Sequence, residues 1–194
     1  MLTAIKYNLA NLGNFKGREG RSSFWFYVLF LVIIQIAISF LISIAMTGPM
    51  MGDVFSAAQQ GASEADIQRR MFDRLAGLMR VSAWTSAVLT LVMVALLFAA
   101  FARRLHDSNK PGWIAGLTAL IQLAGVAIQI ASIDNAVRVV MMARSGDAAG
   151  IQEAQGALML NGLVGWIPVI LVIVFGAWPS TDGENRYGPE PDHL

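Results

Sequence analysis

The sequence contains no cysteine and few charged residues, and both absences narrow the class of protein. Without cysteine there is no disulfide framework, no thiolate chemistry and no cysteine-ligated zinc site. Charged residues make up 14% of the 194 residues, whereas soluble domains carry about 25%. The formal net charge of +1 argues against a nucleic-acid partner, because such proteins usually present a strongly basic face. Hydrophobic residues reach 56% and the mean hydropathy is +0.57, so a lipid bilayer is the expected solvent.

Four stretches are long and apolar enough to cross a membrane. The first, residues 24–46, contains no charged residue and would form a helix about 34 Å long, enough for about 30 Å of hydrocarbon. It is longer than the apolar core of about 7 to 15 residues in a secretory signal, so we expect it to be retained. The other predicted spans are residues 81–102, 112–133 and 157–177. The predicted fold class is therefore all-α: one membrane domain, residues 1–194, built as a bundle of four transmembrane helices.

A further helix is predicted before the second span. Gly48 and Pro49 are expected to end the first helix. Ser63 has Asp66 three residues later, which is a capping-box pattern, and apolar residues then recur at helical spacing as far as Leu78. We predict an amphipathic helix here, which either lies in the membrane interface or extends the second span.

Four spans would place three polar segments on the same side of the membrane: residues 1–23, 103–111 and 178–194. We call these segments the polar cap. Lys and Arg are dense next to the span ends in the cap, whereas the opposite loops are longer and contain more acids. Because short loops rich in Lys and Arg stay inside, we expect a multi-pass protein with both termini in the cytoplasm.

Each cap segment carries a distinctive motif. The motifs are FKGREGRSSFW at residues 15–25, RRLHDSNKPGW at residues 103–113 and DGENRYGPEP at residues 182–191. In sequence, order and spacing they resemble the bacterial inner-membrane family catalogued as domain of unknown function 805. The resemblance implies a small multi-span protein of the bacterial cytoplasmic (inner) membrane, and it brings no established reaction, substrate or cofactor. Segments 47–80 and 134–156 look longer than in compact members of that family.

The cap is the candidate binding site. Arg103 and Arg104 can interact with a helix C-terminus, with lipid phosphates or with acids elsewhere in the chain. His106 beside Asp107 can orient an imidazole for proton transfer, but a histidine satisfied within a turn is the favoured interpretation. The residues that we assign to lipid or partner binding are Arg18, Arg21, Trp25, Arg103, Arg104, His106, Asp107, Trp113, Asp182, Glu184, Asn185, Arg186 and Tyr187.

The acids of the C-terminal segment suggest two further hypotheses. Pairing of Asp182 or Glu184 with the cap arginines would dock this segment onto the rest of the cap, and bidentate arginine contacts are the stronger kind. A metal site would combine these acids with His106, Asp107 and His193, but the residues lack metal-ligand spacing. We predict neither a metal nor a cofactor.

Four amide side chains lie within the predicted spans: Gln35, Gln122, Gln129 and Asn161. Such residues usually hold helices together, and a polar permeation path is the open alternative. The predicted spans contain no Asp, Glu, Lys, Arg or His, which argues against proton-coupled transport.

These observations favour a non-enzymatic membrane protein. We expect the cap to bind an anionic lipid headgroup, since basic interfacial pockets recognise such groups, or a protein partner. The alternative is a small oligomeric transporter or channel subunit lined by the four amides. A membrane enzyme that uses His106 and the acids of the C-terminal segment is less favoured, and we expect no nucleic-acid partner.

Overall fold

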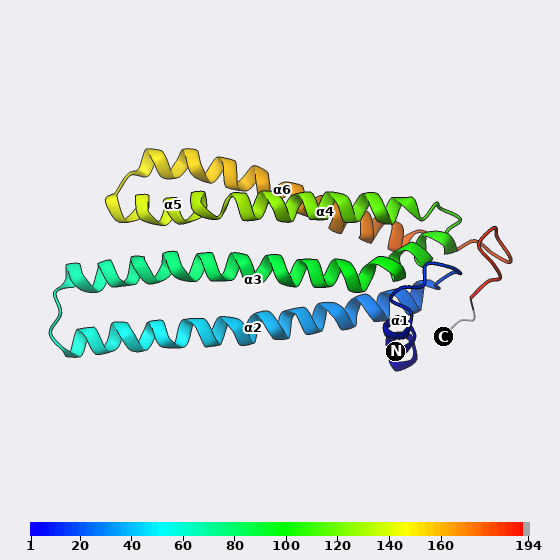
Figure 1. Cartoon of the computed structure of the whole chain (residues 1–194), viewed down its shortest axis with the longest axis horizontal. Helices are drawn as coiled ribbons and strands as arrows, with labels where there is room; N and C mark the ends of the chain where they lie inside the picture. Colours follow the sequence, from blue (N-terminus) through cyan, green and yellow to red (C-terminus); the bar gives the residue numbers. More distant parts are fainter. Residues whose placement is uncertain (192–194) are drawn as a thin grey trace. The chain divides into compact units, whose positions relative to one another are not determined.

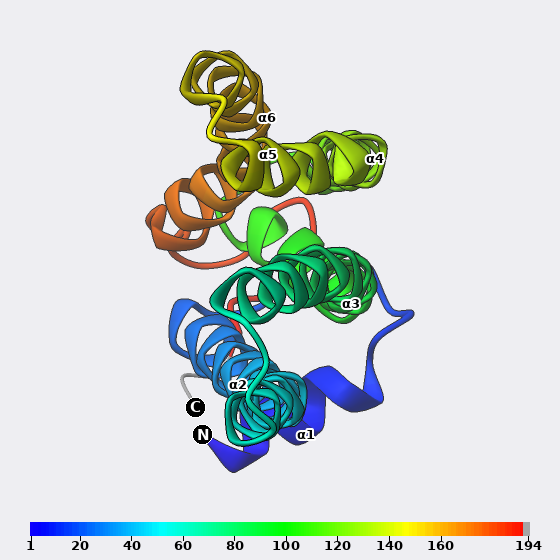
Figure 2. The same ribbon diagram turned by 90° about the vertical axis from the view of Figure 1, so that its left-hand side faces the viewer.

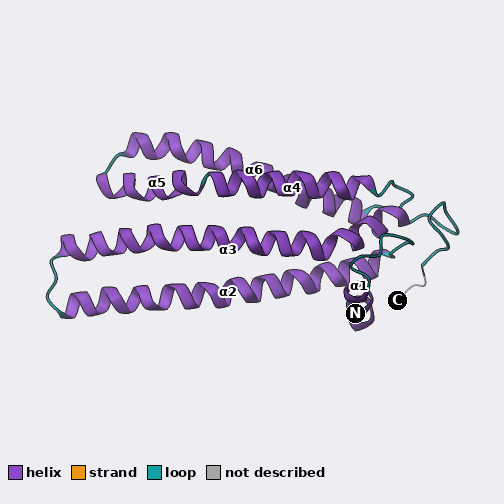
Figure 3. Cartoon of the chain, in the orientation of Figure 1, coloured by secondary structure: helices purple, strands orange, loops and turns teal. Residues whose placement is uncertain are grey.

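A computed structural model describes residues 1–191, apart from the side chains at positions 50, 153, 157, 158, 160 and 161. Within these residues the structure consists of helices joined by loops (Figure 3), with one isolated bridge between Asn185 and Gly188. The helices are α1 (Leu2–Ala10), α2 (Arg21–Gln59), α3 (Glu64–Asp107), α4 (Trp113–Ala131), α5 (Ile133–Ser145) and α6 (Ala148–Ala177). The prediction of an all-α fold is confirmed.

The chain forms two compact units. Unit 1 consists of Met1–Ile34, Leu89–Val126 and Leu163–Leu194, and unit 2 consists of Gln35–Val88 and Ala127–Gly162. Four of the helices, α2, α3, α4 and α6, contribute residues to both units.

Three helices within the described residues are long and apolar enough to cross a membrane: α2, α3 and α4. They contain most of the first three predicted spans. The fourth predicted span, residues 157–177, overlaps a shorter apolar helical segment, Gly162–Ala177. The chain therefore has the long apolar helices of a multi-pass membrane protein.

The prediction that Gly48 and Pro49 end the first helix is wrong, because α2 continues through both residues to Gln59. Proline lacks an N–H donor and costs about 3 kcal/mol inside a helix. In a helix of 39 residues, the turns on either side of Pro49 keep their own hydrogen bonds, and the helix is continuous. Within unit 2, α2 and α3 then lie side by side (Figures 1 and 2).

Residues 64–80 are not a separate helix but the first part of α3, which runs without a break for 44 residues. Of the two alternatives for this segment, extension of the second span is correct. Ser63 caps α3 as predicted, since its Oγ lies 2.7 Å from Asp66 Oδ2 and accepts the Asp66 N–H at 3.2 Å. The helix is about 66 Å long, which is well beyond the hydrocarbon thickness.

The α3–α4 connection is shorter than the polar segment 103–111. Helix α3 extends to Asp107, and the turn lies at residues 108–112. Asn109 adopts a left-handed backbone with φ 55°, which asparagine tolerates better than most residues. The side chains between Arg103 and Asp107 therefore project from the last turns of a helix.

The N-terminal segment contains α1, a helix that we did not predict. One face of α1 is nevertheless buried through Ala4, Ile5 and Asn8. After α1, the chain turns back towards the end of α3, where the Glu19 N–H donates to the Arg103 carbonyl at 3.1 Å.

The hydrophobic core of unit 1 lies directly below the cap. Its buried residues include Phe24, Tyr27, Phe101 and Leu105. A Cβ atom added at Gly176 would lie 2.7 Å from Phe24 Cε1, so only glycine lets α6 approach α2 this closely. This packing fixes the ends of α2, α3 and α6 next to one another.

Candidate functional site

The three cap segments meet in unit 1, where α1, the last turns of α3 and the residues after α6 come together (Figure 1). We call residues 178–191 the tail. Three arginines and two carboxylates of this region are buried. Because isolated buried charges are costly, their partners define what the site can do.

Arg103 is fully buried and all of its five N–H donors have acceptors. Nε and Nη2 lie 3.2 and 3.1 Å from Glu19 Oε2, and Nη2 also donates to Asn8 Oδ1 at 2.5 Å. Nη1 donates to the carbonyls of Asn11 at 3.0 Å and Asn14 at 2.5 Å. Arg103 therefore fastens α1 and the following loop to the end of α3.

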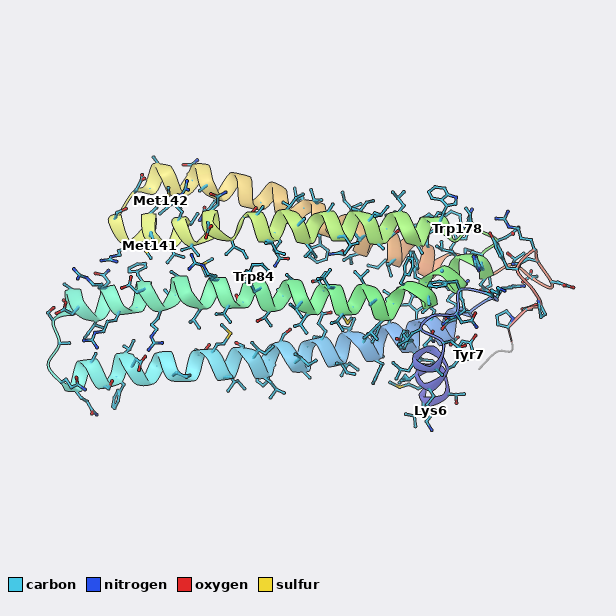
Figure 4. All side chains as sticks on the ribbon, viewed as in Figure 1. Lys6, Tyr7, Trp84, Met141, Met142 and Trp178 are labelled. Atoms are coloured by element: carbon cyan, nitrogen blue, oxygen red, sulfur yellow. The ribbon has the colours of Figure 1, made fainter. Side chains whose placement is uncertain are left out.

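Glu19 is the carboxylate of this first network and is 2% exposed. Its Oε1 accepts hydrogen bonds from Asn8 Nδ2 at 2.5 Å and from Ser23 Oγ at 3.2 Å. Burial raises the pKa of the Glu19 carboxyl, whereas the Asn8 hydrogen bond and the Arg103 charge act to lower it. Tyr7 of α1, which is labelled in Figure 4, completes the network, because its ring centre lies 5.3 Å from the Arg103 guanidinium.

Asp107 is the centre of a second network, and its side chain is fully buried. Its Oδ1 accepts from Arg18 Nε at 3.1 Å, and its Oδ2 accepts from Arg104 Nη1 and, at 2.5 Å, from Ser180 Oγ. The Asp107 carbonyl accepts the Thr181 N–H at 2.9 Å. One residue at the end of α3 thus joins the loop before α2 to the tail.

The Arg18 side chain binds main-chain carbonyls of the tail. Its Nη1 donates to the carbonyls of Gly183 at 2.5 Å and Gly188 at 3.3 Å, and its Nη2 donates to the Thr181 carbonyl at 2.6 Å. Gly183 and Gly188 have φ values of 68° and 131°, which favour glycine. The tail is therefore recognised mainly by its backbone shape.

Arg104 caps the end of α6. Its Nε donates to the Gly176 carbonyl at 3.0 Å, its Nη2 donates to the Trp178 carbonyl, and its Nη1 lies 3.3 Å from Ser180 Oγ. The last carbonyls of a helix have no N–H donor within the helix and carry partial negative charge, so a guanidinium is favourable there.

His106 contacts the tail through both its ring and its backbone. The ring stacks on Tyr187 with centroids 3.8 Å apart and planes at 8°. Its Nδ1 lies 3.2 Å from the Gly17 carbonyl, which can only accept, so Nδ1 carries the proton. Asn185 Nδ2 donates to the His106 carbonyl at 3.0 Å. This arrangement gives His106 a docking role.

The predicted docking of the tail through Asp182 or Glu184 is not what the described residues show. Both side chains are exposed, and the buried arginines pair with Glu19 and Asp107 instead. The tail is held by its carbonyls, by the Thr181 N–H and by the side chains of Ser180, Asn185, Arg186 and Tyr187.

The other predicted cap residues lie around this buried cluster. Arg21 is exposed at the start of α2, and Trp25 is half-buried beside Phe24. Trp113, the first residue of α4, is 66% exposed. Arg186 lies over the Tyr187 ring at 4.7 Å. These residues form the accessible part of the cap.

The predicted amides within the spans do not gather in one unit. Gln35 and Gln129 lie in unit 2, where Gln129 Nε2 donates to the Ala83 carbonyl at 3.3 Å, and Gln122 lies in unit 1. The side chain of Asn161 lies outside the described residues, as does His193. Residues 1–191 contain no group of three or more His, Cys, Asp or Glu side chains that could hold a metal ion.

Five side chains that take part in the buried networks were not among the predicted site residues: Tyr7, Asn8, Glu19, Ser23 and Ser180. Glu19 is the single acid among residues 1–23, and an acid alone among bases is a signal for an internal ion pair. Asn8 lies one helical turn after Ala4, on the apolar face of α1. Ser180 has no comparable signal.

The fold and the cap together define a class: a helical multi-pass membrane protein whose long apolar helices end in a cap of internally paired arginines. The family model described as "Protein of unknown function (DUF805)" matches residues 12–189. The chain belongs to this family, as the three motifs predicted. A comparison with curated proteins and one with solved structures each gave no match.

Proposed function

We propose that this protein crosses the bacterial cytoplasmic membrane four times, with both termini in the cytoplasm, and that its cap binds anionic lipid headgroups without catalysing a reaction. Four helix ends support the four crossings: α2 and α4 begin in the cap, and α3 and α6 end in it. The apolar segment Gly162–Ala177 would supply the fourth crossing, because α6 continues beyond it towards Ala148.

One observation carries the lipid proposal: the cap pairs its buried arginines internally and leaves other cations at its surface. Lys16 and Arg21 are exposed. The Lys110 ammonium lies 4.8 Å from the centre of the Trp178 ring. Exposed tryptophans such as Trp113 and Trp178 belong at the depth of lipid headgroups, and cations at this depth attract anionic lipids.

The residues that contact lipid therefore differ from those that we first expected. Arg103 and Arg104 are fully buried, and their N–H groups donate to protein acceptors. The headgroup contacts are consequently assigned to Lys16, Arg21 and Lys110. The buried Arg103 and Arg104 hold together the segments that carry these cations.

The test is native mass spectrometry of the detergent-solubilised protein with phosphatidylglycerol, and with zwitterionic phosphatidylcholine as the reference lipid. Lys16→Ala combined with Lys110→Ala should weaken retention of phosphatidylglycerol roughly 30-fold, since each cation near an anionic surface contributes about 1 kcal/mol. The matched control is Arg69→Ala with Arg70→Ala, which removes two exposed charges from unit 2. Unchanged retention in the lysine variant, or an equal loss in the control, would overturn the proposal.

A further inference from the structure

The buried arginines of the cap differ in where their acceptors come from. Every acceptor of Arg103 belongs to residues 8–19. Apart from Asp107, the acceptors of Arg18 and Arg104 lie in the tail or at the last turn of α6: Gly176, Trp178, Ser180, Thr181, Gly183 and Gly188. Displacing the tail would therefore uncover Arg18 and Arg104 and leave Arg103 as it is.

The charges around Arg18 and Arg104 do not balance. Two guanidinium groups share the single Asp107 carboxylate, and their other acceptors are neutral carbonyls and a hydroxyl. The bonds from these guanidinium groups to neutral oxygens are already charge-assisted, and a phosphate group would add a full negative charge and bidentate contacts. The tail thus supplies neutral oxygens where a second anion would bind more strongly.

We infer that Arg18 and Arg104 form a binding site for a phosphate group and that the docked tail covers this site. A phosphate group presents several oxygens around one charge, which suits two guanidinium groups that lose their tail carbonyls. Trp178, at the start of the tail, is 43% exposed, and under the proposed function it lies at the depth of lipid phosphates. The inference rests on that proposed function for the source of the phosphate and adds a second, gated site.

An engineered disulfide can lock the tail in place, and no other thiol competes for the pairing because the chain has no cysteine of its own. A Cβ atom at Gly20 would lie 3.7 Å from Pro191 Cγ, so these two positions are direct neighbours and are the pair at which to place cysteines. Gly20→Cys with Pro191→Cys should therefore cross-link the tail to the loop before α2. Oxidised protein should bind phosphatidylglycerol several-fold more weakly than the same protein after reduction.

The tail can also be loosened without changing either arginine. Asn185→Ala with Tyr187→Ala removes the hydrogen bond from Asn185 Nδ2 to the His106 carbonyl and the ring stack on His106. Binding of phosphatidylglycerol should rise about tenfold, and adding Arg18→Gln should cancel the rise. Thr181→Ala is the matched control, because the Thr181 contacts to Asp107 and Arg18 use only its backbone.

Two further ligands complete the test: inorganic phosphate identifies the source of the phosphate, and diacylglycerol is a lipid without a phosphate group. A rise with phosphatidylglycerol, with or without inorganic phosphate, supports the site, and the response to inorganic phosphate decides whether a free ion suffices. No rise in the loosened variant, an equal rise with diacylglycerol, or equal binding by the oxidised and the reduced form of the double-cysteine protein would each overturn it.

The same measurements separate this inference from the proposed function. The Lys16 and Lys110 contacts remain when the tail is locked, so their loss should weaken lipid binding in both redox states. If the lysine variant loses lipid and the lock has no effect, the surface site stands and the gated site fails. If the lock acts and the lysine variant binds normally, the proposed function fails instead.

Discussion

Arginine–carboxylate pairs occur in both units of the molecule, and they differ in burial. In unit 1, the side chains of Arg103 with Glu19 and of Arg104 with Asp107 are at most 1% exposed. In unit 2, the corresponding side chains are between 38% and 84% exposed, in the pairs Arg74 with Asp53, Arg80 with Asp134, and Arg144 with Asp73.

Because of this difference in burial, the two sets of pairs contribute differently to the stability of the fold. An exposed pair contributes about 0 to 1 kcal/mol, because water and salt weaken the attraction. A buried pair must first lose its hydration, so it adds little net stability, but removal of one partner costs about 3 to 5 kcal/mol. The cap pairs therefore determine which segments pack together, whereas the pairs of unit 2 lie on the helix surfaces and contribute little to stability.

The largest effect is expected at Asp107. Asp107→Asn would leave Arg18 and Arg104 buried without a carboxylate and should lower the free energy of unfolding by about 3 to 5 kcal/mol. Denaturant unfolding in detergent micelles, followed by circular dichroism, measures this loss. The matched variant Asp134→Asn removes an exposed partner of Arg80 and should cost less than about 1 kcal/mol. Similar losses in the two variants would remove the distinction between the pairs.

The second prediction concerns the tail. Tyr187→Ala removes a stacked ring, worth about 0.5 to 1.5 kcal/mol, so proteolysis of the tail should become between about 2 and 12 times faster. Asp182→Asn with Glu184→Gln changes two exposed acids and should leave the rate unchanged. Faster cleavage in the acid variant than in the tyrosine variant would show that the charges dock the tail after all.

A smaller effect is expected from the pH dependence of Glu19. Because burial raises its pKa above the usual 4.5, the folded state holds this proton more tightly than the unfolded state. The contribution to stability is then fully present below pH 4.5 and is lost as the pH rises through the raised pKa. Glu19→Gln should flatten this part of the pH profile of the unfolding midpoint. A profile that keeps the same slope in this variant would assign the titration to another group.

The smallest effect is expected for the exposed pairs. Asp53→Asn should lower the free energy of unfolding by about 0 to 1 kcal/mol at low salt. The difference from the wild type should disappear near 1 M salt, where the screening length is about 3 Å. A salt-independent loss would mean that Asp53 is held as firmly as the cap carboxylates.

Local signals in the sequence were sufficient for several parts of the fold. The Ser63–Asp66 cap, the three long apolar helices and the meeting of the cap segments all follow from short-range patterns and from span counting. The helix end predicted at Pro49 was wrong, because the general tendency of proline to end helices was considered without the long helical stretches on both sides of it.

The partners within the cap could not be predicted in the same way. Asp107 lies three residues after Arg104 and pairs with it, but nothing in the sequence indicates that it also reaches Arg18, 89 residues away. The tail acids looked like natural partners for arginine. The structure instead uses backbone carbonyls, and every sequence contains those.

The separation of partners along the chain has a consequence for biosynthesis. The acceptors of Arg103 are all translated before Arg103 itself, so its network can close as soon as α3 is complete. Arg104 must wait for the Gly176 carbonyl, 72 residues later, which takes about 4 to 14 s at about 5 to 20 residues per second. During this interval a nascent chain would present two arginines and one aspartate at the membrane surface, open to whatever reaches them first.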